Sequence, residues 1–150
     1  MAYKALFLPL ISYGILLWGG GYEAVLRRAQ VFQNDALRAI FNRRRRDSVR
    51  DLYIEHNLAT IEVLYKLRVA LLAYKINRKN VPQDVSFSIN PVTKRSDRRV
   101  TSFTLPLCRN ESSRHTLAYR LPAMWGSLPA EVRSIKSAKM FLEAVKDYLR

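Results

Sequence analysis

Residues 22–46 read YEAVLRRAQVFQNDALRAIFNRRRR, and this stretch decides the fold class. Its apolar residues recur every three or four positions, the spacing that places side chains on one face of an α-helix. They are Val25, Ala29, Phe32, Ala36 and Ile40. Arg27, Asn34 and Arg38 fall on another face of the same helix. The pattern predicts one long amphipathic helix over residues 22–41, with an apolar stripe toward the core and a basic stripe beside it.

The arginine run at residues 43–46 predicts the end of this helix. Four adjacent cationic side chains repel one another and contribute nothing to a core. After the run, Asp47 or Ser48 can cap a short helix reaching about His56, with Asp51 near its positive end. The arginines are therefore expected at the joint between two helices.

Three further helices follow from the same reasoning. An apolar helix is predicted over residues 8–18, with Pro9 in its first turn and the glycines 19–21 as its stop. A second is predicted over residues 61–77 with Thr60 as its cap, and it should be the most buried. Its apolar stripe comprises Ile61, Leu64, Leu67, Leu71 and Tyr74. Ser137 is expected to cap a C-terminal amphipathic helix that ends at Leu149.

Residues 78–116 have a different composition, with three prolines, many Ser and Asn, and no sustained helical period. We expect a long loop here, with eight basic and three acidic residues. After it, residues 119–129 suggest a compact apolar plug anchored by Trp125. The sequence thus predicts a mostly α chain with short extended pieces. Its regions are a helical part at 1–77, a basic loop at 78–116, and a plug and helix at 117–150 that packs on the first region as one structural unit.

The charge of the chain points to a polyanionic partner. Its 150 residues carry 26 Lys and Arg against 12 Asp and Glu, a formal net charge of +14, and every third of the chain is basic. Nucleic acid is the first candidate and an anionic membrane the second. An apolar fraction of 49% excludes a disordered basic tail. The predicted phosphate-contacting residues are Arg27, Arg28, Arg38, Arg43, Arg44, Arg45, Arg46, Lys94, Arg95, Arg98 and Arg99.

Few residues of this chain suit catalysis or metal binding. One cysteine and two histidines exclude a disulfide scaffold and a zinc finger. The carboxylates are scattered, and no Gly-rich loop with a lysine offers a phosphate cradle. We expect no catalytic residue, no metal site and no cofactor in this chain, and structural roles for His56, His115 and Cys108.

The uncharged stretch at residues 5–22 leaves a second interpretation open. Such a run is typical of a membrane anchor or an export signal, which would make the chain a membrane-associated or exported basic protein. Pro9, Ser12 and Gly14 interrupt the run, which favours a buried helix broken by proline. A membrane partner is thus the less favoured one, and the nucleus or cytoplasm is expected over secretion.

Several motifs occur in an order that resembles one known family. Residues 9–14 read PLISYG, residues 33–40 read QNDALRAI, and residues 119–125 read YRLPAMW, with SLP at 127–129. Weaker landmarks are Tyr3-Lys4, Trp18-Gly19, Asp47-Ser48-Val49, Tyr74-Lys75-Ile76, Phe141 and Tyr148-Leu149. Together they resemble the C-terminal region, comprising the thumb and the post-thumb segment, of non-LTR (LINE-like) retrotransposon reverse transcriptases of the jockey type. Gly126 departs from the pattern, since this family often has Asn after the tryptophan.

The resemblance implies a function for the whole polyprotein and a narrower one for this chain. In that family a helical thumb grips the RNA template and the growing DNA strand. The palm, whose paired aspartates hold Mg²⁺, and the fingers would lie upstream of Met1. This chain would then be a thumb-like helical bundle that holds RNA and DNA, partners the palm and fingers, and has no enzymatic activity in isolation. An inactive relic of such an element is a further alternative.

Overall fold

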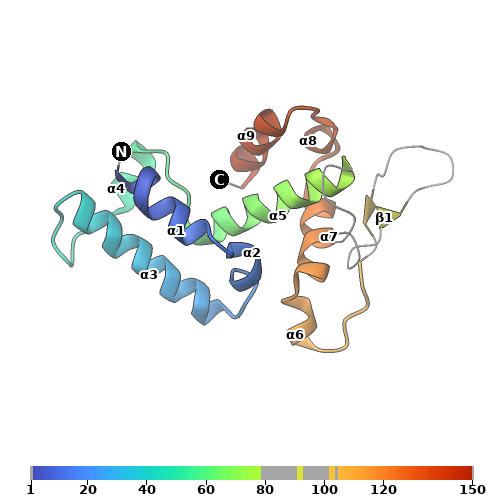
Figure 1. The fold of residues 1–150 in the computed structure, drawn as a ribbon, viewed down its shortest axis with the longest axis horizontal. Helices are drawn as coiled ribbons and strands as arrows, with labels where there is room; N and C mark the ends of the chain where they lie inside the picture. Colours follow the sequence, from blue (N-terminus) through green and yellow to red (C-terminus); the bar gives the residue numbers. More distant parts are fainter. Residues whose placement is uncertain (1, 79–90, 93–101, 104, 150) are drawn as a thin grey trace. The chain divides into compact units, whose positions relative to one another are not determined.

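The computed structural model describes residues 2–78, 91–92, 102–103 and 105–149. The described chain is mostly helical, which confirms the predicted fold class (Figure 1). It divides into two compact units, Met1–Tyr65 and Lys66–Arg150. The division falls inside helix α5 (Ile61–Asn77), whereas the sequence suggested a boundary at its end. The packing of residues 117–150 on the first region stays a prediction.

The N-terminal segment of unit 1 is broken into short helical pieces. A π-helical turn, η1 (Tyr3–Phe7), leads into α1 (Leu8–Ser12), and α2 (Ile15–Trp18) follows. The predicted continuous helix over residues 8–18 is therefore wrong. Gly14 interrupts it with a φ of 61°, a left-handed conformation that glycine adopts without a steric penalty. None of the described helices is long and apolar enough to cross a membrane.

The predicted helix stop at the glycines has a second role in packing. Helix α2 ends at Trp18, and the next residue, Gly19, is buried. A Cβ atom on Gly19 would lie 2.5 Å from the Ile15 carbonyl oxygen and 2.6 Å from the ring of Tyr65. Only glycine lets the chain approach that ring so closely.

Helix α3 (Glu23–Ile40) confirms the predicted long helix, but its buried face is another one. Val25, Phe32 and Ile40 of the predicted core stripe are exposed. The fully buried side chains are Gln33 and Leu37. The apolar periodicity identified the helix correctly, but it predicted the wrong buried face. A polar side chain, Gln33, is buried where an apolar one was expected.

Gln33 joins three segments of unit 1 through its amide. Its Nε2 donates to the hydroxyl of Tyr3, 2.6 Å away, and to the carbonyl of Ala59, 2.9 Å away. Its Oε1 accepts from Nε2 of Gln30 at 2.9 Å. The Oε1 of Gln30 in turn accepts the N–H of Ile61 at 3.0 Å, so it binds one of the free donors at the start of α5. The amide network therefore ties α3 to the N-terminal segment and to α5.

Apolar residues complete the core of unit 1 around this network. Helix α4 (Arg50–Glu55) contributes Leu52, and the residue before it, Val49, is buried as well. They cluster with Tyr3, Phe7 and Leu37. Figure 1 shows η1 and α1 running along α3, and Tyr3 and Phe7 of η1 cluster with Leu37 of α3.

Helix α5 matches its predicted bounds, and Thr60 caps it through a hydrogen bond from the Val63 N–H to Oγ1 at 3.4 Å. It carries more fully buried side chains than any other described helix, which confirms that prediction. Beyond it, unit 2 contains β1 (Pro91–Val92) and β2 (Ser102–Phe103), paired antiparallel, within the predicted loop. The remaining helices are α6 (Glu111–Arg114), α7 (Leu117–Ser127), α8 (Ala130–Ser134) and α9 (Ala138–Tyr148).

The core of unit 2 is aromatic. The predicted plug is helix α7, and its Trp125 is buried as expected, at 2% exposure. The ring centroid of Phe141 lies 6.1 Å from Trp125 and 4.6 Å from Tyr74, and Phe103 meets Trp125 edge-on at 5.8 Å. The hydroxyl of Tyr74 donates to the carbonyl of Lys136. Helix α9 therefore docks through Phe141, as its amphipathic pattern predicts.

Candidate nucleic-acid interface

The chain leaves helix α3 through a sharp reversal at Asn42. This residue has a φ of 51°, a left-handed conformation that asparagine tolerates better than most residues. The N–H of Arg43 donates to the carbonyl of Arg38 at 2.8 Å, and the N–H of Asn42 donates to that of Ala39 at 3.4 Å. This pair of bonds is the Schellman motif, which closes a helix and turns the chain away from its axis. The arginine run therefore begins outside the helix.

Asp47 closes the next turn, and residues 43–48 together form the basic turn. The N–H of Asp47 donates to the carbonyl of Arg44 at 3.0 Å, the bond of a β-turn. The carboxylate of Asp47 accepts the N–H of Arg44 at 2.9 Å. Arg45 and Arg46 occupy the central positions of this turn, at its tip.

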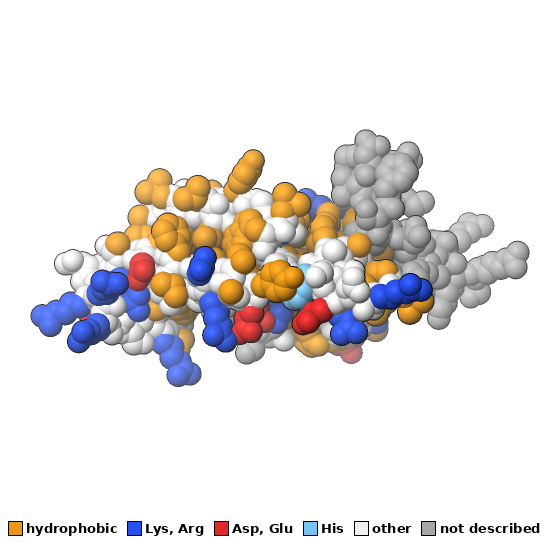
Figure 2. Space-filling model, turned by 90° about the horizontal axis from the view of Figure 1, so that it is seen from below, with side chains coloured by type: hydrophobic (Ala, Val, Ile, Leu, Met, Phe, Trp, Pro, Cys, Tyr) orange, Lys and Arg blue, Asp and Glu red, His pale blue; other side chains and the backbone are white. Residues whose placement is uncertain are grey.

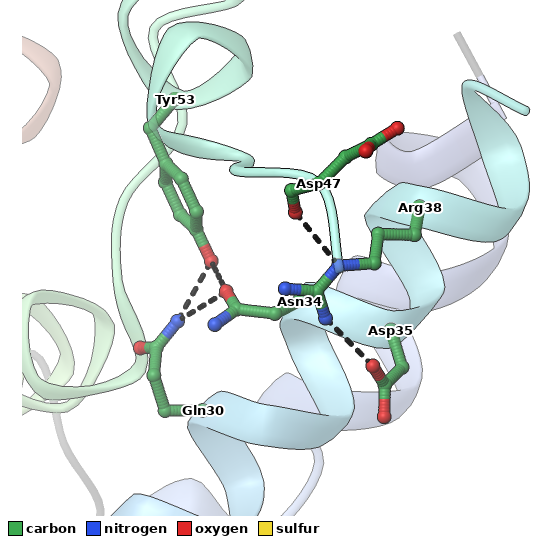
Figure 3. Close-up of polar contacts among 6 residues, drawn as sticks. All are labelled: Gln30, Asn34, Asp35, Arg38, Asp47 and Tyr53. Carbon is green, nitrogen blue, oxygen red and sulfur yellow. Dashed lines mark hydrogen bonds and ion pairs between the residues drawn. The ribbon is translucent and has the colours of Figure 1, made fainter. Parts of the chain in front are cut away.

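Arg38, one of the predicted phosphate ligands, holds this turn from below (Figure 3). Its Nη1 lies 2.8 Å from the carboxylate of Asp35, and its Nε donates to the carbonyl of Asp47 at 3.1 Å. The side chain is only 21% exposed. Arg38 is therefore a positioning residue that fixes the basic turn on α3.

Arg43 fixes the other side of the turn. Its Nη2 lies 2.8 Å from the carboxylate of Asp51 in α4, and both side chains are about half exposed. An ion pair of this exposure stabilises by less than about 1 kcal/mol. It still directs the Arg43 guanidinium toward α4 rather than toward solvent.

The other three arginines of the turn are presented outward. Arg44, Arg45 and Arg46 are exposed, and none of their guanidinium groups has a hydrogen bond or ion pair with another described residue. Figure 2 shows Lys and Arg side chains gathered at the end of unit 1 where α3 connects to α4. Each guanidinium offers five N–H donors in a planar fork that matches a phosphate.

Arg50, in the first turn of α4, is exposed as well and was not among the predicted contacts. Three intervening residues separate it from the arginine run, which hid it from a search for adjacent charges. The predicted start of a helix just after the arginine run is the signal that could have found Arg50. The chain reverses there, so the first turn of α4 lies at the same end of unit 1 (Figure 1).

Arg27 and Arg28 form a separate basic cluster in the first half of α3. Arg27 donates from Nε and Nη2 to the carboxylate of Glu23, at 3.0 and 2.7 Å, and both side chains are 77% exposed. So exposed a pair leaves the arginine available to another anion. From Arg28 to the end of α3 at Ile40 the helix rises about 18 Å, so this cluster and the basic turn lie far apart on one helix. Lys94, Arg95, Arg98 and Arg99 lie outside the described residues.

Tyr53 and Tyr3 belong to the hydrogen-bonded core of unit 1. The Tyr53 hydroxyl accepts from Nε2 of Gln30 at 2.7 Å and donates to Oδ1 of Asn34 at 2.8 Å (Figure 3). Burial raises the pKa of Tyr53 well above its usual value, and it raises the pKa of Tyr3 as well. Both phenols therefore stay neutral over the physiological range, and they act as structural residues.

The described residues also include the histidines and carboxylates that a metal site would need. Among them, no group of three or more His, Cys, Asp or Glu side chains is arranged to hold a metal ion. His56 stacks on Phe41 with the ring centroids 4.7 Å apart, and His115 lies 3.0 Å from a guanidinium nitrogen of Arg120. Comparisons of the chain with protein-family models, curated proteins and solved structures find no match.

Proposed function

We propose that this chain binds the phosphate backbone of RNA and DNA through the basic turn. One observation carries the proposal: Arg44, Arg45 and Arg46 are exposed and free of described partners, while Arg38, Arg43 and Asp47 fix the turn that presents them. Because the backbone of the turn is already fixed, its binding to phosphate loses little conformational entropy. More of the attraction between the three guanidinium groups and phosphate then contributes to the affinity.

Such a surface recognises nucleic acid without reading its sequence. Contacts to phosphate oxygens set position and orientation, whereas sequence is read at the base edges. Arg27 and Arg28 offer a second point of contact along α3, and Arg50 extends the first. These positions suit a duplex that is held along its backbone.

The motif order supports a finer proposal, that the chain is the thumb and post-thumb region of a non-LTR retrotransposon reverse transcriptase. In this proposal the template and primer duplex is the ligand. The palm and fingers of the parent polyprotein are the protein partners, and Mg²⁺ belongs to that palm. The chain itself binds the duplex and contributes no catalytic residue.

A binding titration over a range of salt concentrations tests the proposal. Fluorescence anisotropy of a labelled RNA–DNA hybrid and of a DNA duplex gives the affinity at each concentration. If about six phosphates are neutralised, log K against log salt falls with a slope of about −5 on DNA. Absence of affinity, or a slope near zero, would contradict the proposal.

A matched pair of variants separates the basic turn from net charge alone. The variant R44A/R45A/R46A should flatten the slope by about 3, since each phosphate contact contributes about 0.9. The control R109A/R114A/K139A removes the same charge from exposed positions of unit 2. An equal loss in both variants would show that net charge, not the turn, sets the affinity.

A membrane surface is the second candidate, and one observation favours it. Leu6, Leu10, Tyr13 and Leu17 are each more than two-thirds exposed. Exposed apolar side chains of this kind can enter the interface of a bilayer. Co-sedimentation with vesicles of neutral and of anionic lipid tests this alternative. Depletion by neutral vesicles that L6S/L10S/L17S abolishes would support it.

A further inference from the structure

Ser48 stands directly behind the arginine run, in the order Arg45, Arg46, Asp47, Ser48. We propose that Ser48 is the phosphoacceptor of a serine/threonine protein kinase that selects arginines three and two residues before the acceptor, and that its phosphate switches off the basic turn. The modification itself needs only the local structure of this segment. Its effect on binding rests on the proposed function.

The local structure leaves the Ser48 hydroxyl available. The side chain is exposed, and its Oγ accepts the N–H of Arg50 at 3.3 Å. Its own proton is donated to no described residue, so the hydroxyl can be deprotonated and its oxygen can attack phosphorus without breaking a strong bond. Ser48 also lies outside the helices, in the connection between α3 and α4.

The arginines before Ser48 match what such a kinase recognises. Arg45 and Arg46 project from the tip of the turn, and a guanidinium fork binds a carboxylate through two parallel hydrogen bonds. Kinases choose substrates by charge patterns of this kind. Two hydrogen bonds within the turn and a third from Arg38 to the Asp47 carbonyl hold it closed, and the kinase must break them to bind the segment as an extended strand. Local opening of an exposed connection costs less free energy than unfolding of the core. Val49, which is 6% exposed, anchors the downstream side, so recognition comes from the residues before Ser48.

The reaction is a transfer of the γ-phosphoryl group of ATP. A bond forms between Ser48 Oγ and the γ-phosphorus, while the bond from that phosphorus to the β,γ-bridging oxygen breaks and ADP leaves. The hydroxyl proton passes to the catalytic aspartate of the kinase and then to solvent. The kinase supplies the catalytic aspartate, and ATP supplies the phosphoryl group.

The phosphate would neutralise the surface that the proposed function needs. Four arginines and Asp47 give the basic turn a charge of +3. A phosphoserine adds about −2 at neutral pH, leaving about +1. Its oxygens also accept hydrogen bonds from neighbouring guanidinium groups, which then no longer reach an external phosphate. The loss of about two phosphate contacts should flatten the salt slope by about 2.

The test starts from the full chain with a T101A background, because Thr101 follows Arg98 and Arg99 at the same spacing as Ser48 follows its arginines. The protein is incubated with an arginine-directed kinase and ATP, and peptide mass spectrometry locates the phosphate. We expect a phosphate on Ser48, none at this position in S48A/T101A, and strongly reduced incorporation in R45A/R46A/T101A. The salt titration is then run on the phosphorylated and unphosphorylated protein.

Each outcome bears on one of the two proposals. Absence of phosphate on Ser48 overturns the inference, whatever the binding data show. Phosphate on Ser48 with an unchanged slope also overturns it, while the proposed function stands. If the unmodified chain binds neither RNA nor DNA, the proposed function fails, and the switch fails with it even where Ser48 is modified. A phosphate on Ser48 together with a slope flattened by about 2 supports both.

Discussion

The two units of this protein hold their helices together by different means. In unit 1, buried amides and phenol hydroxyls join α3 to the N-terminal segment and to the start of α5 through directional hydrogen bonds. In unit 2, the rings of Tyr74, Phe141 and Trp125 pack in series, and the buried indole N–H of Trp125 has no acceptor among the described residues. A hydrogen-bonded core specifies one geometry, whereas an aromatic core derives its stability from buried area.

The largest effect is expected from Trp125→Ala, which removes the centre of the aromatic core. Loss of this fully packed side chain should cost about 3–5 kcal/mol of the free energy of unfolding. Hydrogen exchange read by mass spectrometry should show the loss of protection concentrated in residues 66–78 and 105–149. An equal loss of protection throughout residues 2–65 would contradict the division into two cores.

A smaller but sharper effect is expected from Gln33→Leu, which keeps the size of the side chain and removes its amide. The hydroxyl of Tyr3 and the carbonyl of Ala59 lose their donor, and Gln30 loses an acceptor. Buried polar groups left without partners cost about 1–3 kcal/mol. Chemical denaturation followed by the fluorescence of Trp18, in a background without Trp125, measures the loss in unit 1.

A double variant tests whether orphaned groups cause that loss. Tyr3→Phe removes the hydroxyl that Gln33→Leu leaves unpaired, so Y3F/Q33L should be more stable than the sum of the two single changes predicts. Strict additivity would mean that the hydroxyl and the amide do not act as a pair. It would also remove the contrast between a polar and an apolar core.

The sequence predicted helix α5 to the residue and helix α3 nearly so, because caps and apolar spacing act locally. It did not predict which face of α3 is buried. Gln33 is polar, and only its partners from distant segments, Tyr3 and Ala59, make its burial favourable. The break at Gly14 was missed for a related reason, since a glycine inside an apolar run is compatible with a helix until tertiary packing selects the turn.

The candidate site shows the same limit. The arginine run could be predicted to lie at a helix joint, because adjacent charges exclude it from a core. Which arginines of the run fix the turn and which face solvent could not be predicted from the sequence. This depends on the left-handed residue Asn42 and on where the turn places Asp47 and Asp51. Of the predicted phosphate-contacting residues, Arg38 fixes the turn on α3, whereas the guanidinium groups of Arg44, Arg45 and Arg46 are exposed to solvent.

Alkaline pH should weaken the polar core through its tyrosines, and this is the smallest effect expected for a single residue. Burial raises the folded-state pKa of Tyr53 above the unfolded value of 10.0. Below that value the phenol is neutral in both states and its stabilising effect is complete. Above it the unfolded chain releases the proton while the folded chain retains it, so stability falls by at most about 1.4 kcal/mol for each pH unit. Denaturation of the wild type and of Tyr53→Phe at pH values from 9 to 11 measures this slope.

The variant should lose less stability above pH 10 than the wild type, although it starts lower because the bonds to Gln30 and Asn34 are gone. Parallel curves would mean that the Tyr53 hydroxyl is solvated in the folded chain, and the polar core would then be confined to Gln33 and its direct partners.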